Sequence, residues 1–162
     1  MKQGKVQAYY GYGRGKTSAA LGHAIQEASK GGNCVVLQFL KERDDDEIEF
    51  ARRLEPQIKL FRFQKSAELY DNLTEDGKFE EDLNMKNGLN YARKVLVTGE
   101  CSLLVLDEVL GLLDKKILTV EELVKLLQAR TVETTIILTG RVMDERLLPY
   151  IDEVYRIYTE KE

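Results

Sequence analysis

A glycine-rich segment at residues 11–18 constrains the fold more than any other part of the sequence. The segment reads Gly11-Tyr12-Gly13-Arg14-Gly15-Lys16-Thr17-Ser18. It lies between a run of β-forming residues at 6–10 and an apolar run with helical spacing that begins at residue 19. A strand, a glycine-rich loop and the start of a helix form the context in which phosphate-binding loops occur. The segment therefore predicts a nucleotide-binding fold organised around this loop.

The residue types in this loop match the chemistry of phosphate binding. Glycines let successive backbone N–H groups point at an anion, and the helix start adds unpaired N–H groups and the positive end of its dipole. Lys16 supplies a mobile positive charge, and the hydroxyl of Thr17 or Ser18 is a ligand type that Mg²⁺ accepts. Gly11 stands only four residues before Gly15, so the loop is one residue shorter than the general G-x-x-x-x-G-K-[ST] pattern. The alternative is a glycine-rich turn that only caps a helix.

Strand patterns alternate with helical patterns along the whole chain. We expect strands at 5–10, 34–40, 58–63, 102–106, 134–138 and 152–157, and helices at 16–29, 46–54, 79–98 and after a capping box at 119–122. Residues 64–78 are polar without a clear period, and we expect them to be mobile. This alternation is typical of a three-layer α/β fold with a mostly parallel sheet, here a P-loop NTPase fold of the RecA-like type. A length of 162 residues predicts a single domain, 1–162.

Polar side chains follow the expected strands at the points where these strands end. The carboxyl ends of parallel strands share one edge, so these side chains should converge with the loop at 11–18. An acid at the end of an apolar strand is how P-loop proteins hold Mg²⁺, which makes Asp107 the expected ligand. Glu108 is then expected to orient or deprotonate a water or to support the metal shell. The alternative is that Asp107 only caps the next turn. Gln38 either contacts the nucleotide or is satisfied within the sheet, and Arg141 either contacts phosphate or lies in a surface turn.

Composition excludes several classes of function. The net charge of −4 argues against a general binder of nucleic acid or of membrane surfaces. The sequence has no apolar stretch of about 18 residues and no apolar signal core at the N-terminus, so we expect no membrane span. The two cysteines, Cys34 and Cys101, lie far apart and suit a reducing cytoplasm, where we expect this protein. The single histidine, His23, is expected to pack or face solvent rather than to take part in catalysis.

The motifs resemble those of the P-loop ATP:corrinoid adenosyltransferases, which act on cob(I)yrinic acid a,c-diamide or cob(I)alamin. Family members carry a shortened loop resembling G-N-G-K-G-K-T-T-A-A, and residues 11–20 match it, including the missing position. Further matches follow in the same order: V-x-Q-F-x-K at 36–41, L-D-E at 106–108 and L-T-G-R at 138–141. The resemblance extends over residues 5–157.

This resemblance implies a reaction and a set of roles. ATP and Mg²⁺ would bind at the loop, and a reduced Co(I) corrinoid would attack the ribose 5′ carbon and release triphosphate. Lys16 and the loop amides would hold phosphate, Thr17 and Asp107 would serve the metal with support from Glu108, and Arg14 would add positive charge. The cobalt is the nucleophile, so no side-chain nucleophile is needed. The family is usually homodimeric and takes electrons from a reduced flavoprotein, which are therefore the expected partners besides cobalamin or its precursor.

The segment expected to contact the corrinoid departs from the family pattern. The family has a segment resembling G-x-G-F-T-W, whereas residues 60–65 contain no glycine and the chain has no tryptophan. Phe61 and Phe63 are the candidates for corrinoid contact, and the alternative is that they pack within the fold. The N-terminal extension and the basic tail of family members are also missing from this sequence. Two other functions stay open: an ATP-binding paralogue without corrinoid activity, and an ATPase or kinase-type P-loop phosphotransferase.

Overall fold

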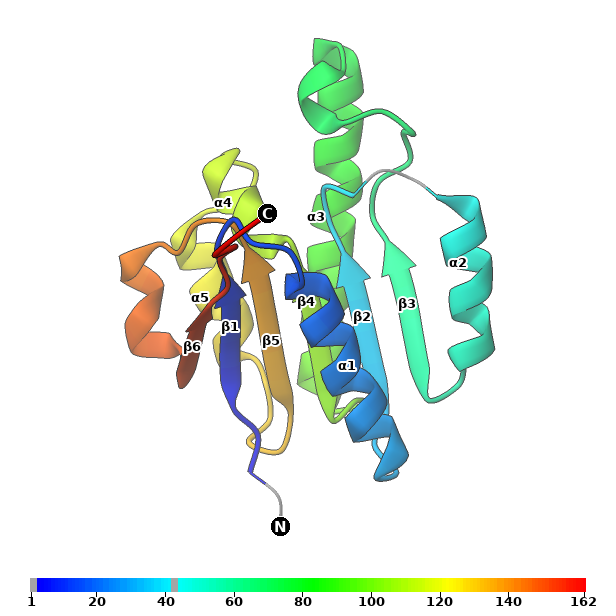
Figure 1. Ribbon diagram of the computed structural model, residues 1–162, viewed down its shortest axis with the longest axis vertical. Coiled ribbons are helices and arrows are strands. Elements are labelled where there is room, and N and C mark those ends of the chain that lie inside the picture. The colour runs from blue at the N-terminus through cyan, green and yellow to red at the C-terminus, as the bar shows by residue number, and fades with distance from the viewer. Residues whose placement is uncertain (1–2, 42–43) are drawn as a thin grey trace.

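The computed structural model describes residues 3–41 and 44–162, and Figure 1 shows their arrangement around one central sheet. In this part of the chain the sheet has six strands in the order β3-β2-β4-β5-β1-β6, and every strand pair is parallel. The strands are β1 (Val6–Tyr10), β2 (Cys34–Gln38), β3 (Ile58–Arg62), β4 (Leu103–Asp107), β5 (Thr135–Gly140) and β6 (Glu153–Arg156). The predicted α/β class with a parallel sheet is confirmed.

Helices cover both faces of the sheet (Figure 1). The helices are α1 (Lys16–Ser29), α2 (Asp45–Ala51), α3 (Glu75–Thr98), α4 (Val109–Asp114) and α5 (Val120–Gln128), with short 3-10 segments η1 (Arg52–Leu54), η2 (Tyr70–Asn72) and η3 (Glu145–Tyr150). The connections through α1 and α2 run toward β3 in front of the sheet, whereas those through α3, α4 and α5 run back behind it. This is the arrangement expected if every crossover is right-handed.

The central strands are apolar without interruption because both of their faces are buried. In β4, Leu104 and Leu106 belong to the core under α3, α4 and α5, while Leu103 and Val105 pack with Ala20 and Ala24 on the α1 side. Successive strand side chains point to opposite faces, so a strand covered on both sides needs apolar residues at each position. In the edge strand β3, Ile58 is buried, Leu60 and Arg62 are half-buried, and Lys59 and Phe61 are exposed.

Several element boundaries differ from the predicted ones. The long helix α3 begins at Glu75 rather than at residue 79, because the Thr74 hydroxyl caps it by accepting the Gly77 N–H at 3.1 Å. Strand β2 ends at Gln38 rather than at 40, since Leu40 adopts a left-handed backbone with φ of 55°. The segment expected to be mobile, 64–78, contains η2 and the first turn of α3, and its mobility stays a prediction.

The predicted capping box at residues 119–122 is confirmed. Thr119 and Glu122 form the reciprocal capping box of α5, with each side chain accepting the other residue's backbone N–H at 3.1 Å. Gly99 ends α3 in the left-handed conformation, and Asp144 caps η3. None of the helices in residues 3–41 and 44–162 is long and apolar enough to cross a membrane.

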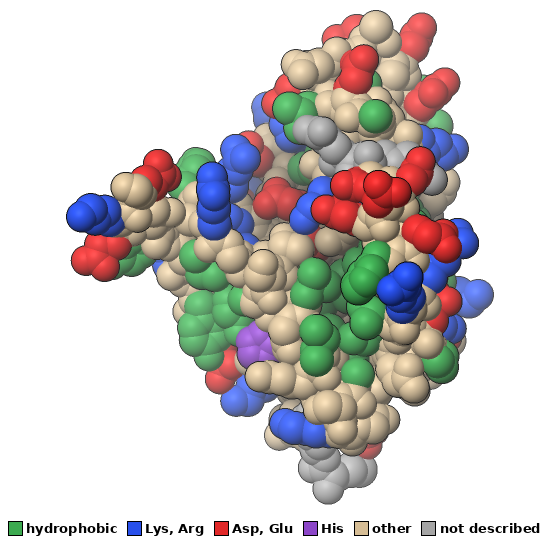
Figure 2. Space-filling view, turned by 45° about the vertical axis from the view of Figure 1, so that its right-hand side comes forward, with side chains coloured by type: hydrophobic (Ala, Val, Ile, Leu, Met, Phe, Trp, Pro, Cys, Tyr) green, Lys and Arg blue, Asp and Glu red, His purple; other side chains and the backbone are tan. Residues whose placement is uncertain are grey.

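His23 packs against aromatic residues, as expected. Its Nε2 lies 2.7 Å from the Tyr9 hydroxyl, and the Tyr9 ring stacks on Tyr155 with 5.0 Å between the ring centroids. Figure 2 shows the histidine beside a hydrophobic group on the surface. This arrangement joins α1 to β1 and β6.

Candidate active site

The polar residues that follow the strands converge at the carboxyl edge of the sheet. Gln38 pairs in register with Asp107 across β2 and β4, and Tyr10, which precedes the glycine loop, pairs with Gly140 at the end of β5. The backbone N–H of Gly11 donates to the Gly140 carbonyl at 3.0 Å, which holds the start of the loop at this edge. The loop at 11–18 and the acidic end of β4 therefore belong to one site.

Asp107 is the buried centre of this site, with only 1% of its surface exposed. Its Oδ1 accepts a hydrogen bond from the Thr139 hydroxyl at 2.7 Å, and the Thr17 hydroxyl lies 3.0 Å from both carboxylate oxygens. The Gln38 amide donates to Oδ2 at 3.3 Å, and the Lys41 ammonium lies 3.8 Å from the same atom. A buried carboxylate is costly unless it is paired and hydrogen-bonded, and these donors meet that requirement.

Two of the loop glycines, Gly11 and Gly13, are required by a close approach of the chain that follows β6. Gly13 donates its N–H to the Ile157 carbonyl at 3.1 Å, and a Cβ at residue 13 would lie 2.7 Å from the Tyr158 Cα. Gly11 has a φ of 126° and would also clash with Ile157, whereas Gly15 has a φ of 107° with open space around it. Residues 157–158 thus form the outer wall of the loop, a role that the sequence analysis did not find.

The side chains of the loop divide into two groups. Lys16 and Thr17 are half-buried, and the Lys16 ammonium donates to the Gly13 carbonyl at 2.8 Å, folded back over the loop. Tyr12, Arg14 and Ser18 are exposed. Of the two hydroxyls that the sequence offers as a metal ligand, it is therefore Thr17 that lies beside Asp107.

Glu108 continues the chain from Asp107 in a left-handed conformation with φ of 64°. Its backbone N–H donates to the Thr139 hydroxyl at 2.7 Å, so Thr139 joins both acidic residues. Burial raises the pKa of the Glu108 carboxyl above its ordinary value, and the negative charge of Asp107 adds to this effect. Three nearby cations oppose the shift: Lys16, Arg141 and Lys41.

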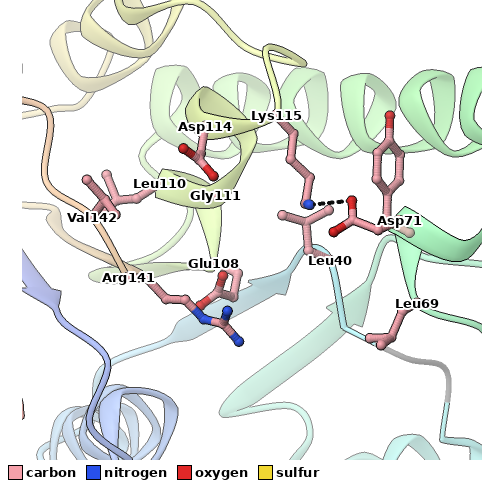
Figure 3. Close-up of a pocket in the computed structure, with 11 residues that line it drawn as sticks. Leu40, Leu69, Asp71, Glu108, Leu110, Gly111, Asp114, Lys115, Arg141 and Val142 are labelled. Carbon is pink, nitrogen blue, oxygen red and sulfur yellow. Dashed lines mark hydrogen bonds and ion pairs between the residues drawn. The ribbon is translucent and has the colours of Figure 1, made fainter.

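A cavity of about 250 Å³ opens directly beside Glu108 (Figure 3). Glu108 and Arg141 lie together at one end of it, and an ion pair of 2.6 Å between Lys115 and Asp71 lies at the other. Its apolar lining includes Leu40, Leu69, Leu110 and Val142, together with the ring of Tyr70. The cavity is therefore a partly apolar space with charged groups at both ends, adjoining the acidic end of β4.

Phe61 and Phe63, the candidates for contacts with a second substrate, make packing contacts instead of lining this cavity. The Phe61 ring meets Tyr91 edge-on at 5.2 Å between centroids. The Phe63 ring stacks on Phe39 at 5.8 Å and lies so close to Gly88 that a side chain there would collide with it. The lining comes partly from residues 69–71, a segment that the sequence analysis read only as polar, although Leu69 and Tyr70 form an apolar pair within it.

The donor set at the end of β4 is suitable for Mg²⁺. Among the described residues, no group of three or more His, Cys, Asp or Glu side chains is placed to hold a metal without help. Asp107 and Thr17 instead offer a carboxylate and a hydroxyl side by side. Mg²⁺ prefers hard oxygen ligands and commonly takes only one or two from the protein, with phosphate oxygens and water completing its shell.

Solved structures similar to this chain share its fold. A KaiC-like protein from Pyrococcus horikoshii matches with a TM-score of 0.57 and 24% identity over 86% of this chain and 64% of that one. The RadB recombinase matches with a TM-score of 0.57 and 15% identity over 96% of this chain and 74% of that one. The fold is thus that of the P-loop NTPases, and the prediction of a RecA-like P-loop architecture is confirmed.

The chain belongs to the ATP:corrinoid adenosyltransferase BtuR/CobO/CobP family, whose model matches residues 2–162. The corrinoid adenosyltransferase of Escherichia coli K12 and that of Salmonella typhimurium are each 26% identical over 159 residues, covering 94% of this chain and 76% of theirs. An uncharacterized protein of Nostoc sp. is 32% identical over 163 residues, covering 92% of this chain. The match includes 42% of the Nostoc protein, so the chain spans less than half the length of that relative. The predicted family is confirmed, and with it a relation to ATP-dependent transferases that act on corrinoids.

Proposed function

We propose that this protein transfers the 5′-deoxyadenosyl group of ATP to a reduced Co(I) corrinoid and releases triphosphate. One observation carries the proposal: the Thr17 hydroxyl of the glycine loop lies against the Asp107 carboxylate, at the same sheet edge as the cavity beside Glu108. These observations support a nucleotide site that would adjoin a space for a second substrate, as the activity of the family requires.

The loop and its neighbours would bind the triphosphate. In this proposal the N–H groups of the loop and the Lys16 ammonium hold phosphate oxygens, while Arg14 and Arg141 add positive charge around them. Thr17 and Asp107 hold Mg²⁺, which when bound would neutralise phosphate charge. Gln38 would act within the sheet by donating its amide to Asp107, so its contribution to ATP binding is indirect.

The reaction requires orientation and charge stabilisation rather than a protein nucleophile. The Co(I) centre supplies the electron pair that forms the bond to the 5′ carbon, the bond from that carbon to oxygen breaks, and triphosphate leaves with the electron pair of the broken bond. In this proposal the loop cations would stabilise the charge that develops on the leaving triphosphate, which is the usual way in which such sites lower a barrier. Holding both substrates in line supplies the remaining contribution.

The cavity in Figure 3 is the proposed entry point of the corrinoid. Its apolar walls, formed by Leu40, Leu69, Leu110 and Val142, suit the edge of a macrocycle, and its charged ends suit polar substituents. Phe61, with 37% of its surface exposed, and Phe63 would then support this region from outside the cavity. We also propose a homodimer and a reduced flavoprotein as the electron source, on the basis of the family resemblance.

The proposal is tested by incubating the protein with ATP, Mg²⁺ and a corrinoid under strong reductant. We expect the absorbance spectrum to change to that of the adenosylated corrinoid, and we expect Lys16→Ala to abolish this change. The matched control is Lys30→Ala, which removes an exposed ammonium at the far end of α1 and should leave the rate unchanged. Absence of product, together with a rise in thermal midpoint on adding ATP, would instead favour the paralogue that binds ATP without corrinoid activity.

A further inference from the structure

Three polar side chains form a straight row across the sheet at the active edge. Arg62 at the end of β3 pairs in register with Gln38 at the end of β2, and Gln38 pairs in register with Asp107 at the end of β4. The Arg62 Nε and Nη2 atoms donate to the Gln38 Oε1 atom at 3.0 and 2.7 Å. The Gln38 Nε2 atom donates in turn to Asp107 Oδ2 at 3.3 Å. A neutral amide therefore links a cation to the buried acid.

Arg62 is buried to an unusual degree for a charged residue on an edge strand. Only 3% of its side chain is exposed, and its Nη2 atom also lies 2.8 Å from the Glu47 carboxylate of α2. Figure 2 shows a group of acidic side chains on this face of the protein, and the start of α2 carries Asp44, Asp45, Asp46 and Glu47. A guanidinium is held at low exposure only where hydrogen bonds and opposite charge compensate it, and Gln38 and Glu47 both do so here.

The chemistry of the row permits one orientation of the Gln38 amide. The two ends of a glutamine amide are nearly identical in shape, so packing alone does not choose between them. An arginine only donates hydrogen bonds, and an ionised carboxylate only accepts them. The Gln38 oxygen must therefore face Arg62, and its NH₂ group must face Asp107. A flipped amide would place its oxygen against the Asp107 carboxylate and its NH₂ group against the donors of Arg62.

We infer that Arg62 is a positioning residue for the metal site: it fixes the Gln38 amide so that the amide holds Asp107 in place beside Thr17. The inference rests on the proposed function, because it assigns Arg62 a part in binding Mg²⁺ with ATP. Arg62 acts through Gln38 and touches neither substrate nor metal in this assignment. Outer-shell partners of this kind typically contribute tenfold to a hundredfold in metal affinity.

The first test measures the apparent affinity for Mg²⁺ at saturating ATP. We expect Arg62→Met, which keeps the length but removes the donors, to weaken Mg²⁺ binding by roughly tenfold or more while metal-free ATP binding changes little. Arg62→Lys should recover part of the loss, and it replaces Arg62→Met if that variant does not fold. The matched control is Lys59→Met, which removes an exposed cation from the same strand.

A double substitution distinguishes positioning from general support of the fold. Because Arg62 acts through Gln38, we expect Arg62→Met to have almost no further effect on Mg²⁺ affinity in a Gln38→Met background. The inference would be overturned if the two substitutions weakened Mg²⁺ binding by factors that multiply in the double variant. It would also be overturned if the Mg²⁺ affinity of Arg62→Met were within threefold of that of the wild type.

A metal-free measurement separates this inference from the proposed function. The Gln38 side-chain NH₂ resonances can be identified in nuclear magnetic resonance spectra of the protein without nucleotide, because they are lost in Gln38→Met. In the wild type, we expect these NH₂ protons to exchange slowly with water. We expect Arg62→Met to broaden the resonances or to speed this exchange, and we expect Lys59→Met to do neither. Unchanged resonances in Arg62→Met would overturn the inference, whatever the metal does. If ATP binding by the wild type does not depend on Mg²⁺, only the proposed metal site is contradicted. The amide resonances would still show whether Arg62 fixes the Gln38 amide.

Discussion

The Thr17 hydroxyl lies 3.0 Å from each carboxylate oxygen of Asp107, although 90 positions separate the two residues in the sequence. Thr17 is in the first turn of α1, directly after the glycine loop, and Asp107 is the last residue of β4. Since α1 packs over β4, the first turn of the helix is brought to the end of that strand. This contact joins the part of the chain that would hold phosphate to the part that would hold Mg²⁺.

Replacing Thr17 by valine tests whether this hydroxyl serves the metal. Valine keeps the branched shape and removes the oxygen, so we expect ATP binding in the presence of Mg²⁺ to weaken by about tenfold or more, with metal-free binding nearly unchanged. Titration calorimetry with and without Mg²⁺ measures both quantities, and Thr17→Ser should restore most of the affinity. If Thr17→Val and the wild type bind ATP equally well in the presence of Mg²⁺, the Thr17 hydroxyl does not bind the metal.

Replacing Thr139 by valine tests the hydrogen bonds that support the two acids. The Thr139 hydroxyl donates to Asp107 and accepts the Glu108 N–H, both at 2.7 Å. Its loss leaves a buried carboxylate and a backbone donor with fewer partners, so we expect a loss of about 1–3 kcal/mol in the free energy of unfolding. Denaturant titration measures this, with Thr98→Val at an exposed helix position as the control. A loss no larger than that of the control would show that neither hydrogen bond matters for stability.

The raised pKa of Glu108 predicts how stability depends on pH. The folded protein holds this proton more tightly than the unfolded chain does, so the contribution of Glu108 to stability is present at low pH and is lost as pH rises through the raised pKa. In the protein without nucleotide, Glu108→Gln removes the buried negative charge. It should therefore raise the free energy of unfolding at pH 7 to 8, and the gain should shrink toward pH 4. Unfolding titrations across this range check the trend, and a gain that stays constant or grows on acidification would contradict it.

Burial predicts that the two thiols are unreactive in the folded protein. Cys34 and Cys101 are both buried, and burial raises the pKa of Cys101 to about 12, so almost none of that thiol is ionised at pH 8. A disulfide reagent should react slowly with the native protein and should titrate both thiols once denaturant is added. Rapid reaction of either thiol under native conditions would show that the packing around it is looser than described.

The parts of the site that are local in sequence could be predicted, whereas those built by packing between distant segments could not. The glycine loop and the acid at the end of β4 are each recognisable from a few adjacent residues, and the parallel sheet then implies that they meet. The burial of Arg62 could not be predicted, because the sequence of β3 does not reveal that α2 contacts the last residue of the strand. The contact of residues 157–158 with Gly13 was missed for the same reason, since only the folded chain brings them together.

Hydrophobic periodicity could predict neither the first residue of α3 nor the lining of the cavity. Residues 75–78 are polar and show no helical period, so periodicity alone placed the helix start at 79, but the Thr74 cap and the acidic first turn begin it earlier. Leu69 and Tyr70 line the cavity only because η2 turns their segment toward α4. An apolar pair inside a polar segment was the one sequence signal that could have indicated this contact.

Identification of the products formed from ATP distinguishes adenosyl transfer from hydrolysis. With ATP, Mg²⁺ and a reduced corrinoid, the account predicts one equivalent of intact triphosphate for each corrinoid that gains a bond from cobalt to the 5′ carbon, and no triphosphate when the corrinoid is omitted. Formation of ADP and phosphate, whether or not the corrinoid is present, would contradict the proposed adenosyl transfer and would identify the protein as a phosphohydrolase.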